Sequence, residues 1–354
     1  MKIANKIHRC NCSDGYIGEK CNLQVSGAEG QGKWYLVQGE DELSLPPRTA
    51  HTTTFVANCI WVFGGFDLNR VLSDLWQYCI HENMWRNISQ KITIDEEHFF
   101  EYDNETQINQ TLKFKQDPWP AARSGHAMDV FEDGFFVFGG TLGDGSHSRE
   151  LWFFNTTTLG WDLKARSSIV SPENVTDHTI TLADDFLYLL GGKNDNRVFV
   201  DSVYRISARF PQEWEKVLIK GGVYPPKKLV GHTTVYHKPS RSLLVFGGYT
   251  QPTALFGDRT KDILMLNIEN LYWSKLENDN WNRGSRPRDR AFHSAVQMGN
   301  YMVVYGGNTH NHHEIFEICY NHQVFFYHLS CHVWLNHTYF TGQSHSSTPL
   351  INSF

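Results

Sequence analysis

The chain has 354 residues, 40% of them hydrophobic, and a formal net charge of −6. This length and composition are enough for one large domain with a buried core and a small appendage. The acidic balance and the lack of a basic stripe argue against a nucleic-acid-binding protein. We find no apolar run of about 18 residues, so we expect no membrane segment in this chain.

The first 22 residues contain three of the seven cysteines, Cys10, Cys12 and Cys21, and begin without the apolar core of a signal peptide. The C-x-C-x8-C run, with Gly and an aromatic residue before its last Cys, resembles the second half of an EGF-like module. The resemblance implies a Cys12–Cys21 disulfide and a partner for Cys10 upstream of this chain, so residues 1–22 are interpreted as a partial EGF-like module. A zinc site is the less favoured alternative, because a fourth ligand at suitable spacing is missing. Residues 23–33 are interpreted as a Gly-rich linker.

A repeated pattern follows, most clearly at residues 48–88. Apolar residues alternate in four short stretches, which predicts four antiparallel strands: one opens at His51, one ends in Gly64-Gly65, one contains Tyr78 and one contains Trp85. The paired glycines return four more times, at Gly139-Gly140, Gly191-Gly192, Gly247-Gly248 and Gly306-Gly307. Five repeats of roughly 50 residues, each forming one sheet, predict a β-propeller.

The spacing inside the repeats keeps them in phase. An aromatic or leucine residue precedes a tryptophan by seven residues in four repeats: Tyr78–Trp85, Phe154–Trp161, Leu266–Trp273 and Tyr327–Trp334. The third repeat departs, because Tyr204 and Trp214 are ten residues apart. Each first strand opens with a histidine: His51, His126, His178, His232 and His293. The glycine doublet, the third-strand aromatic and the fourth-strand Trp resemble kelch repeats over residues 34–335.

Trp34 precedes His51 by 17 residues, as Trp161 precedes His178. Trp34 therefore occupies the position of a fourth-strand tryptophan, although no first, second or third strand precedes it in the sequence. An outer strand supplied from the N-terminus closes many propellers, so we predict the N-terminal strand of an incomplete sixth blade. The alternative is a closed five-bladed ring with Trp34 on a spare edge strand. Residues 336–354 have no glycine doublet and are interpreted as a disordered or foreign tail.

Four cysteines lie inside the repeats. Cys59 and Cys79 are each ten residues from Asn69, so a regular hairpin places them opposite one another and favours a cross-strand disulfide. Cys319 and Cys331 flank the third strand of the fifth repeat and form the second expected pair. Buried free thiols are the alternative.

Glycosylation triplets support an oxidising compartment. Asn11 lies beside a cysteine and is the least favoured; the predicted sites are Asn87, Asn104, Asn109, Asn155, Asn174 and Asn336. With the disulfides, they predict an extracellular or cell-surface ectodomain. We therefore expect this chain, which lacks a signal peptide, to be a fragment, an alternative start or an incomplete gene product.

Strand parity predicts one variable face. In a four-stranded blade the fourth strand ends on the face where the second turns into the third. The long insertion between Trp85 and His126 therefore shares a face with the loops that follow the glycine doublets, residues 66–73, 141–149, 193–200, 249–261 and 308–322. Variable loops on a rigid scaffold are common recognition sites.

No catalytic site, metal site or cofactor is predicted. His310, His312 and His313 form a loop cluster without a helix to fix them, which favours a solvated loop. The first-strand histidines, preceded by Arg48, Arg123 and Arg290, are assigned to packing and hydrogen bonding within each blade. Recurring acids before the third strand are assigned to turn capping: Asp74, Glu150, Asp201 and Asp262. A kelch-scaffold copper oxidase has no recognisable ligand set here.

An EGF-like segment followed by kelch repeats with cysteines and glycosylation triplets resembles the attractin family, including the multiple-EGF kelch receptors, over residues 10–335. The resemblance implies a non-catalytic extracellular module that binds a protein or glycan ligand and acts in cell interaction or receptor modulation. The alternative is an intracellular kelch adaptor that recruits substrates to a ubiquitin ligase, which usually has an N-terminal helical dimerisation domain; the sequence shows no such helical stretch.

Overall fold

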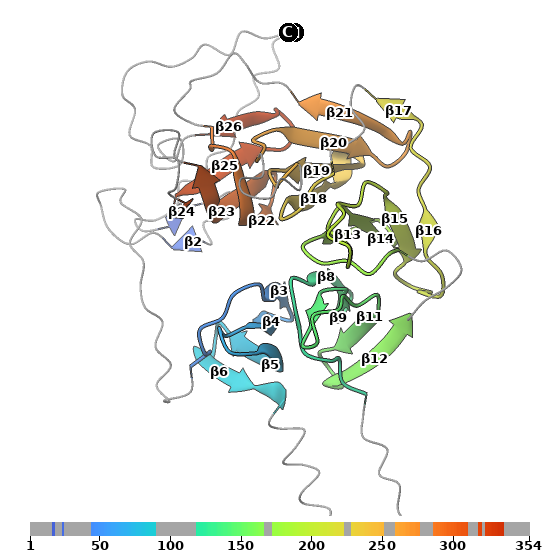
Figure 1. Cartoon of the computed structure of the whole chain (residues 1–354). Coiled ribbons are helices and arrows are strands. Elements are labelled where there is room, and N and C mark those ends of the chain that lie inside the picture. The colour runs from blue at the N-terminus through green and yellow to red at the C-terminus, as the bar shows by residue number, and fades with distance from the viewer. Residues whose placement is uncertain are drawn as a thin grey trace, which may run out of the picture.

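The computed structural model describes residues 16–17, 23–24, 44–89, 118–165, 172–222, 228–250, 259–276, 286–310, 318–320 and 323–335. Within them, five sheets, each built on four antiparallel strands, succeed one another around an axis (Figure 1). The predicted all-β propeller with five complete blades is confirmed.

The blades follow chain order, and each runs from an inner first strand to an outer fourth strand. Blade 1 contains β3 (Thr52–Val56), β4 (Cys59–Phe66), β5 (Val71–Cys79) and β6 (Met84–Asn87). Blade 2 contains β8 (Ala127–Phe131), β9 (Gly134–Phe138), β11 (Leu151–Asn155) and β12 (Gly160–Ala165). Blade 3 contains β13 (Thr179–Ala183), β14 (Phe186–Leu190), β15 (Tyr204–Ser207) and β16 (Glu215–Lys216). Blade 4 contains β18 (Thr233–His237), β19 (Ser242–Phe246), β20 (Ile263–Asn267) and β21 (Tyr272–Leu276). Blade 5 contains β22 (Arg290–Met298), β23 (Tyr301–His310), β25 (Val324–His328) and β26 (Val333–Leu335).

Smaller elements join these sheets. They are β7 (Arg123–Ser124), which pairs with β10 (Thr141–Leu142); β17 (Gly221–Gly222), which pairs in parallel with β21; β24 (Ile318–Tyr320), which pairs with β23; the 3₁₀ turn η1 (Lys238–Ser240); and the N-terminal pair β1 (Tyr16–Ile17) and β2 (Leu23–Gln24). Because β17 covers the outer edge of blade 4, that edge does not expose a row of unpaired backbone groups.

The seven-residue spacing is a strand register. Tyr78 lies directly opposite Trp85, and the same pairing joins Phe154 to Trp161. Leu266–Trp273 and Tyr327–Trp334 repeat it. In blade 3 the longer connection changes the register, so Tyr204 pairs with Lys216 instead of Trp214.

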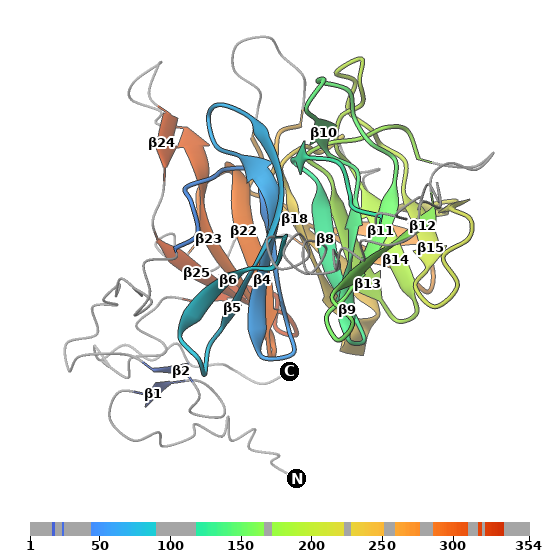
Figure 2. The same ribbon diagram turned by 90° about the horizontal axis from the view of Figure 1, so that it is seen from below.

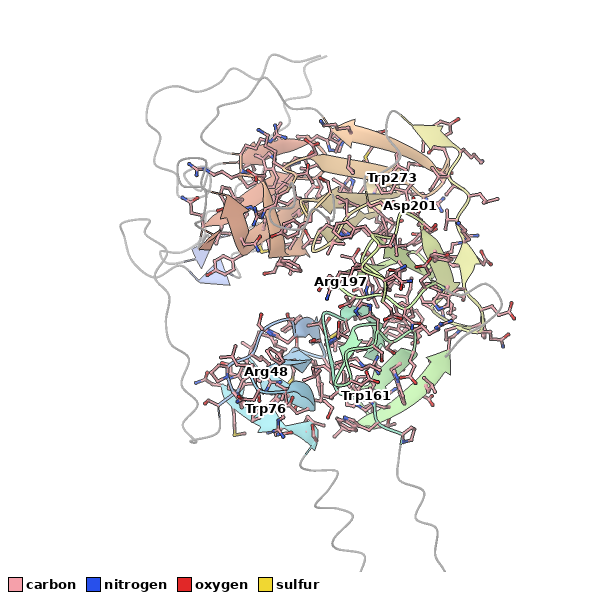
Figure 3. All side chains as sticks on the ribbon, in the orientation of Figure 1. Arg48, Trp76, Trp161, Arg197, Asp201 and Trp273 are labelled. Carbon is pink, nitrogen blue, oxygen red and sulfur yellow. A yellow bond between two sulfur atoms is a disulfide. The ribbon has the colours of Figure 1, made fainter. Side chains whose placement is uncertain are left out.

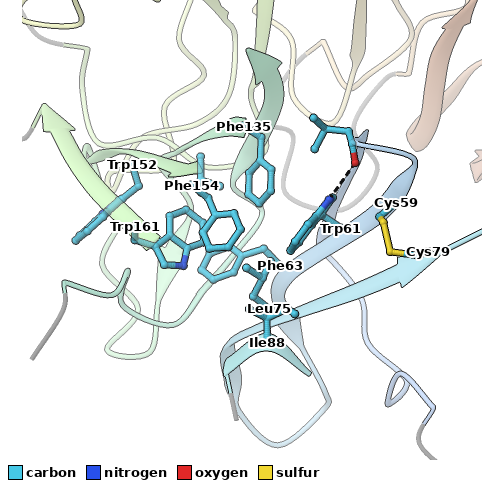
Figure 4. Close-up of a cluster of buried hydrophobic side chains, with 12 residues drawn as sticks. Cys59, Trp61, Phe63, Leu75, Cys79, Ile88, Phe135, Trp152, Phe154 and Trp161 are labelled. Atoms are coloured by element: carbon cyan, nitrogen blue, oxygen red, sulfur yellow. Dashed lines mark hydrogen bonds between the residues drawn. A yellow bond between two sulfur atoms is a disulfide. The ribbon is translucent and has the colours of Figure 1, made fainter. Parts of the chain in front are cut away.

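Apolar cores lie between consecutive blades. Trp161 of blade 2 packs on Phe63 of blade 1 with ring centroids 4.9 Å apart (Figure 4). Trp214 packs on Phe138 at 4.9 Å, and Trp334 on Phe246 at 5.1 Å. Burial of each such side chain contributes about 1.5–3 kcal/mol, so each blade is stabilised by its neighbours.

The first glycine of the doublet makes room for the next blade in blades 1 to 4. Gly64 has φ +60°, and a Cβ there would lie 2.6 Å from the carbonyl oxygen of Arg123 and 3.0 Å from Cε1 of His126. Gly139 has the same relation to His178. The doublet therefore does more than end a strand, because it lets a histidine of the following blade approach the backbone.

Backbone hydrogen bonds connect the blades close to the axis. In blades 2 to 5 the residue before the first-strand histidine donates its N–H to the corresponding carbonyl of the preceding blade. The four links are Gly125 to Ala50 (2.8 Å), Asp177 to Gly125 (2.8 Å), Gly231 to Asp177 (3.0 Å) and Phe292 to Gly231 (2.8 Å). We call this series the collar.

The Cys59–Cys79 disulfide is confirmed. The two residues pair directly between β4 and β5, with Cα atoms 4.1 Å apart. Both are buried at the edge of the core shown in Figure 4.

The expected Cys319–Cys331 disulfide is wrong, because Cys331 is a free, exposed thiol. Cys319 pairs with Thr309, whereas Tyr301, at the other end of β23, pairs with His328, just before Cys331. The two ends are roughly 27 Å apart at about 3.4 Å per residue, too far for a disulfide.

Several sequence predictions lie outside the described residues. They are the cysteines of the EGF-like segment and their Cys12–Cys21 pair, the Trp34 strand, the long acidic insertion and the tail 336–354.

Candidate functional site

The parts of the predicted loops that the structure describes lie on one face (Figure 2). Trp119, at the end of the long insertion, donates its indole N–H to the carbonyl of Ser73 at the start of β5. β10 and β24, which belong to the loops after the doublets of blades 2 and 5, project on the same side of the ring in Figure 2. We call this side the loop face.

On blades 4 and 5 the loop face presents an aromatic and cationic cluster. The Arg259 guanidinium lies over the Tyr249 ring, 4.8 Å from its centroid, and Tyr249 contacts Phe292 at 5.8 Å between centroids. The Arg259 Nε–H (3.0 Å) and the Tyr249 hydroxyl (3.4 Å) both donate to Oδ1 of Asn308. The loops that follow the doublets of blades 4 and 5 are thereby held together.

Phe292 stands out within this cluster. It has φ +55° and is 52% exposed. The equivalent collar positions, also left-handed, hold small or polar residues: Ala50, Gly125, Asp177 and Gly231. A bulky residue in this conformation is strained, and strain of this kind concentrates at functional sites. Sequence reasoning missed Phe292, although its place before His293 is visible when the repeats are aligned.

On blades 2 and 3 the loop face is polar. Asn174 accepts from Nε of Arg149 (2.5 Å) and donates to Asp195 (2.8 Å), and the Asp195 carboxylate lies 3.2 Å from His147. Lys193 forms an ion pair with the collar residue Asp177 at 2.8 Å. The two halves of the face therefore differ in chemistry.

The first-strand histidines form hydrogen bonds between blades, so the expected hydrogen bonding within each blade is wrong. Among the described residues they do not gather as a metal site. Nε2 of His126 lies 2.7 Å from the hydroxyl of Thr52, Nε2 of His232 3.1 Å from Thr179, and Nε2 of His293 2.7 Å from Thr233. Burial lowers the pKa of His232 to about 4 and the pKa values of His178 and His293 to about 3. These imidazoles are therefore neutral at physiological pH.

The recurring acids were assigned to turn capping, and for two of them this is wrong. Asp74 forms a bidentate ion pair with Arg48 (2.8 and 2.9 Å) and accepts a hydrogen bond from the indole N–H of Trp76. Arg48 and Trp76 lie side by side on blade 1 in Figure 3. Glu150 repeats this with Arg123 (3.2 Å) and Trp152. Hydrogen bonding to the guanidinium and the indole lowers the pKa of Asp74 against the opposing effect of burial.

The other two recurring acids, Asp201 and Asp262, have different surroundings from Asp74 and Glu150. Asp262 forms ion pairs with Lys275 (3.2 Å) and Arg286 (3.9 Å). Asp201 lines a small pocket between blades 3 and 4, together with Ser202, His232 and Trp273 (Figure 3). The pocket exists where Leu190 replaces the Phe found at the same place in blades 1, 2 and 4. A Ser–His–Asp site is not supported, because Nε2 of His232 is taken by Thr179 and its low pKa makes it a poor base.

Three predicted glycosylation sites are described. Asn174 belongs to the polar half of the loop face, and Asn87 ends β6 on that side. Asn155 ends β11 on the opposite face, where it donates to Asp133 and accepts from the amides of Thr157 and Thr158. All three are half-buried. Asn104, Asn109 and Asn336 lie outside the described residues.

Within the described ranges, no three His, Cys, Asp or Glu side chains gather as a metal site. The side chains of His310, His312 and His313 are not among those described. No helix in the described part of the chain has the length and apolar character to cross a bilayer.

Comparison with known proteins identifies two family models. The attractin/LZTR1 β-propeller model matches residues 92–350, and the kelch motif matches residues 47–91. The first match includes much of the segment interpreted from sequence as a tail.

The chain is similar to curated proteins of two kinds. It is 33% identical to human multiple epidermal growth factor-like domains protein 8 over 92% of this chain and 12% of that protein, and 34% identical to the mouse protein over 89% and 10%. It is 22% identical to the Drosophila melanogaster leucine-zipper-like transcriptional regulator 1 homolog over 75% of this chain and 25% of that protein. The chain thus spans about a tenth of the length of the first two relatives.

Proposed function

Because the chain belongs to the attractin/LZTR1 β-propeller family, we propose that it is a non-catalytic interaction module of an extracellular protein. It binds a protein or glycan partner through the loop face, in cell interaction or receptor modulation. The observation that carries this proposal is the exposed Phe292 in a left-handed conformation beside Tyr249 and Arg259.

The residue types of this cluster favour binding. Aromatic residues and arginine are enriched among the side chains that dominate interface energies. The Asn308 amide holds Tyr249 and Arg259 in place, which lowers the entropy lost when a partner binds. The neutral histidines and the arginine-paired Asp74 and Glu150 have structural roles, which supports a module without catalysis.

Two features support an extracellular location. The Cys59–Cys79 pair is a buried disulfide, and such bonds persist in oxidising compartments. Two of the relatives are named for EGF-like domains, which are small disulfide-dense modules of secreted proteins. A glycan on Asn174 would cover the polar half of the loop face and leave the Phe292 cluster accessible.

The alternative is an intracellular kelch adaptor that recruits substrates to a ubiquitin ligase. One relative is named as a transcriptional regulator, so the fold alone does not separate the two locations. That alternative requires reduced Cys59 and Cys79. A kelch-scaffold copper oxidase is a weaker alternative, and metal analysis of the purified protein tests it.

Binding to intact cells tests the proposal. The labelled protein is applied to a panel of cell types, with Phe292→Gly as the test variant and Phe210→Gly as the control. Phe210 is 74% exposed in the strand connection of blade 3, away from the cluster. We expect Phe292→Gly to reduce saturable binding at least about tenfold and Phe210→Gly to leave it unchanged. Equal binding by both variants would sink the proposal, and prior protease or glycosidase treatment of the cells distinguishes protein from glycan partners.

A further inference from the structure

Basic side chains from two separate segments meet on the loop face of blades 4 and 5. One segment is residues 259–262, which lead into β20, and the other is residues 286–290, at the start of β22. Two hydrogen bonds hold them side by side: Nη2 of Arg286 donates to the Lys261 carbonyl (3.3 Å), and the N–H of Arg290 donates to the Thr260 carbonyl (3.4 Å). The fold thus creates a basic surface from residues that are 25 or more positions apart in the sequence.

The two segments have an excess of positive charge. Together they contain five basic and two acidic residues, in a chain with a net charge of −6. One of the acids, Asp262, already has two cationic partners, Lys275 (3.2 Å) and Arg286 (3.9 Å). The polar half of the loop face is different, because its cations pair with acids, as Lys193 does with Asp177. The positive charge is therefore concentrated on blades 4 and 5.

Four of these cations are accessible to a partner, and we call them the basic band: Arg259, Lys261, Arg286 and Arg288. Lys261 and Arg288 are exposed, and the side chain of Arg286 is 25% exposed. Pro287 is buried and anchors the segment between the last two arginines. Arg259 is half-buried and lies over the Tyr249 ring. The band therefore borders the aromatic cluster.

The second segment also has more hydrogen-bond donors than acceptors. Nη1 of the buried Arg290 donates to the Gly306 carbonyl (2.8 Å), but its Nη2 has no acceptor among the described residues, and neither has Nε of Arg286. In blades 1 and 2 the equivalent arginines pair with Asp74 and Glu150. Unpaired donors and unbalanced charge both favour an anionic partner.

The shape of the surface favours a linear polyanion over an acidic peptide. A bound peptide usually needs side-chain pockets or a free sheet edge. The pocket described above lies between blades 3 and 4, and the outer edge of blade 4 is already paired with β17. A sulfated glycan has negative charges along its whole length, so it can bind to exposed Arg and Lys on an open surface through ion pairs alone. The extracellular location proposed above favours such a glycan over a nucleic acid.

We infer that the basic band binds a sulfated glycosaminoglycan of the cell surface. Its sulfate groups form ion pairs with the exposed guanidinium and ammonium groups of Lys261 and Arg288, and the adjacent Arg259 and Arg286 extend the contact along the glycan. This inference rests on the proposed function and deepens it, because it names the class of partner and adds a second surface beside Phe292.

Binding to immobilised heparin tests the inference. The test variant is Lys261→Gln with Arg288→Gln. The control is Arg70→Gln with Lys216→Gln, which changes the net charge equally at exposed positions of blades 1 and 3. We expect the unmodified protein to bind heparin but not desulfated heparin. The test variant should bind at least about tenfold more weakly, and the control should bind normally.

A charge-conserving variant separates charge from structure. Lys261→Arg with Arg288→Lys keeps both positive charges and should bind heparin like the unmodified protein. Failure of the unmodified protein to bind heparin at physiological ionic strength overturns the inference, as does an equal loss of binding in the test and control variants. Displacement by polyglutamate as effective as displacement by heparin also overturns it, in favour of an acidic protein partner.

The cell-binding assay keeps this inference apart from the proposed function. Loss of cell binding after heparinase treatment and in the Lys261→Gln, Arg288→Gln variant supports the inference. Cell binding that requires Phe292 but survives both changes overturns the glycosaminoglycan and leaves the proposed function standing.

Discussion

The hydroxyl of Thr52 in blade 1 lies 2.7 Å from Nε2 of His126 in blade 2, and this pair is the unit that joins successive blades. It recurs between blades 3 and 4 and between blades 4 and 5. Between blades 2 and 3 the threonine is replaced by Ala127, and Nε2 of His178 is buried without a partner among the described residues.

Ala127→Thr should therefore stabilise the protein. The new hydroxyl supplies His178 with the partner that its counterparts have, which is worth about 0.5–1.5 kcal/mol. Urea unfolding measures the effect. Ala127→Val is the control, because valine has the shape of threonine without the hydroxyl, and it should show no such gain. Equal stability of the two variants would contradict the role assigned to His178.

Acid should destabilise the propeller below about pH 6.5. The pKa values of His126, His178, His232 and His293 are lowered, chiefly by burial. The unfolded chain therefore binds protons more readily, and each histidine lowers the free energy of unfolding by about 2 kcal/mol between pH 7 and pH 5. Burial raises the pKa of Asp129 to about 6, which partly opposes this loss.

Urea unfolding at pH 7.5, 6 and 5 checks the acid effect. His178→Asn should reduce the loss by about 1.4 kcal/mol per pH unit below pH 6. A free energy of unfolding that is constant between pH 7.5 and pH 5 would show that these histidines are not buried in a neutral state.

The Cys59–Cys79 disulfide should stabilise blade 1. It closes a loop with a sequence separation of 20 residues, for which the loop-entropy relation gives about 3 kcal/mol. We expect the double Cys→Ala variant to lose this amount in urea unfolding and to be insensitive to reducing agent. Reduction that leaves the stability of the unmodified protein unchanged would argue against the bond.

Gly139→Ala should be more damaging than Gly145→Ala. Both glycines have positive φ, +69° and +85°, so alanine strains the backbone at either. Only at Gly139 would a Cβ also lie 2.5 Å from Cε1 of His178 and 2.7 Å from the Val175 carbonyl oxygen. We expect about 1 kcal/mol of destabilisation at Gly145 and at least about twice that at Gly139, measured by thermal or urea unfolding. Equal losses would contradict the inter-blade role of the doublet.

The sequence predicted how neighbouring strands pair within a single blade. The seven-residue spacing predicted that Tyr78 pairs with Trp85 on the next strand. The equal number of residues from Asn69 to Cys59 and to Cys79 predicted that the two cysteines lie opposite one another. Both follow from the fixed rise of paired strands. The Cys319–Cys331 prediction failed because proximity in sequence was used without the position of each residue along β23.

Side-chain contacts between residues far apart in sequence were not predicted. The Arg48–Asp74 pair within blade 1 and the Thr52–His126 pair between blades 1 and 2 join residues 26 and 74 positions apart, and periodicity within a repeat does not show which neighbour a side chain faces. The position of Phe292 before His293 is visible in the aligned repeats, but its left-handed conformation is known only from the structure. The loop face itself was predicted, because strand parity alone decides which connections share it.

Peptide mapping by mass spectrometry of the protein, directed into the secretory pathway of animal cells by an added signal peptide, tests the central claim most directly, since it reports on an extracellular, disulfide-bonded propeller. The account predicts a Cys59–Cys79 cross-linked peptide that separates on reduction, together with glycan at the predicted Asn residues, including Asn155 or Asn174. Free thiols at Cys59 and Cys79 with every predicted Asn unmodified would contradict it and favour the intracellular adaptor.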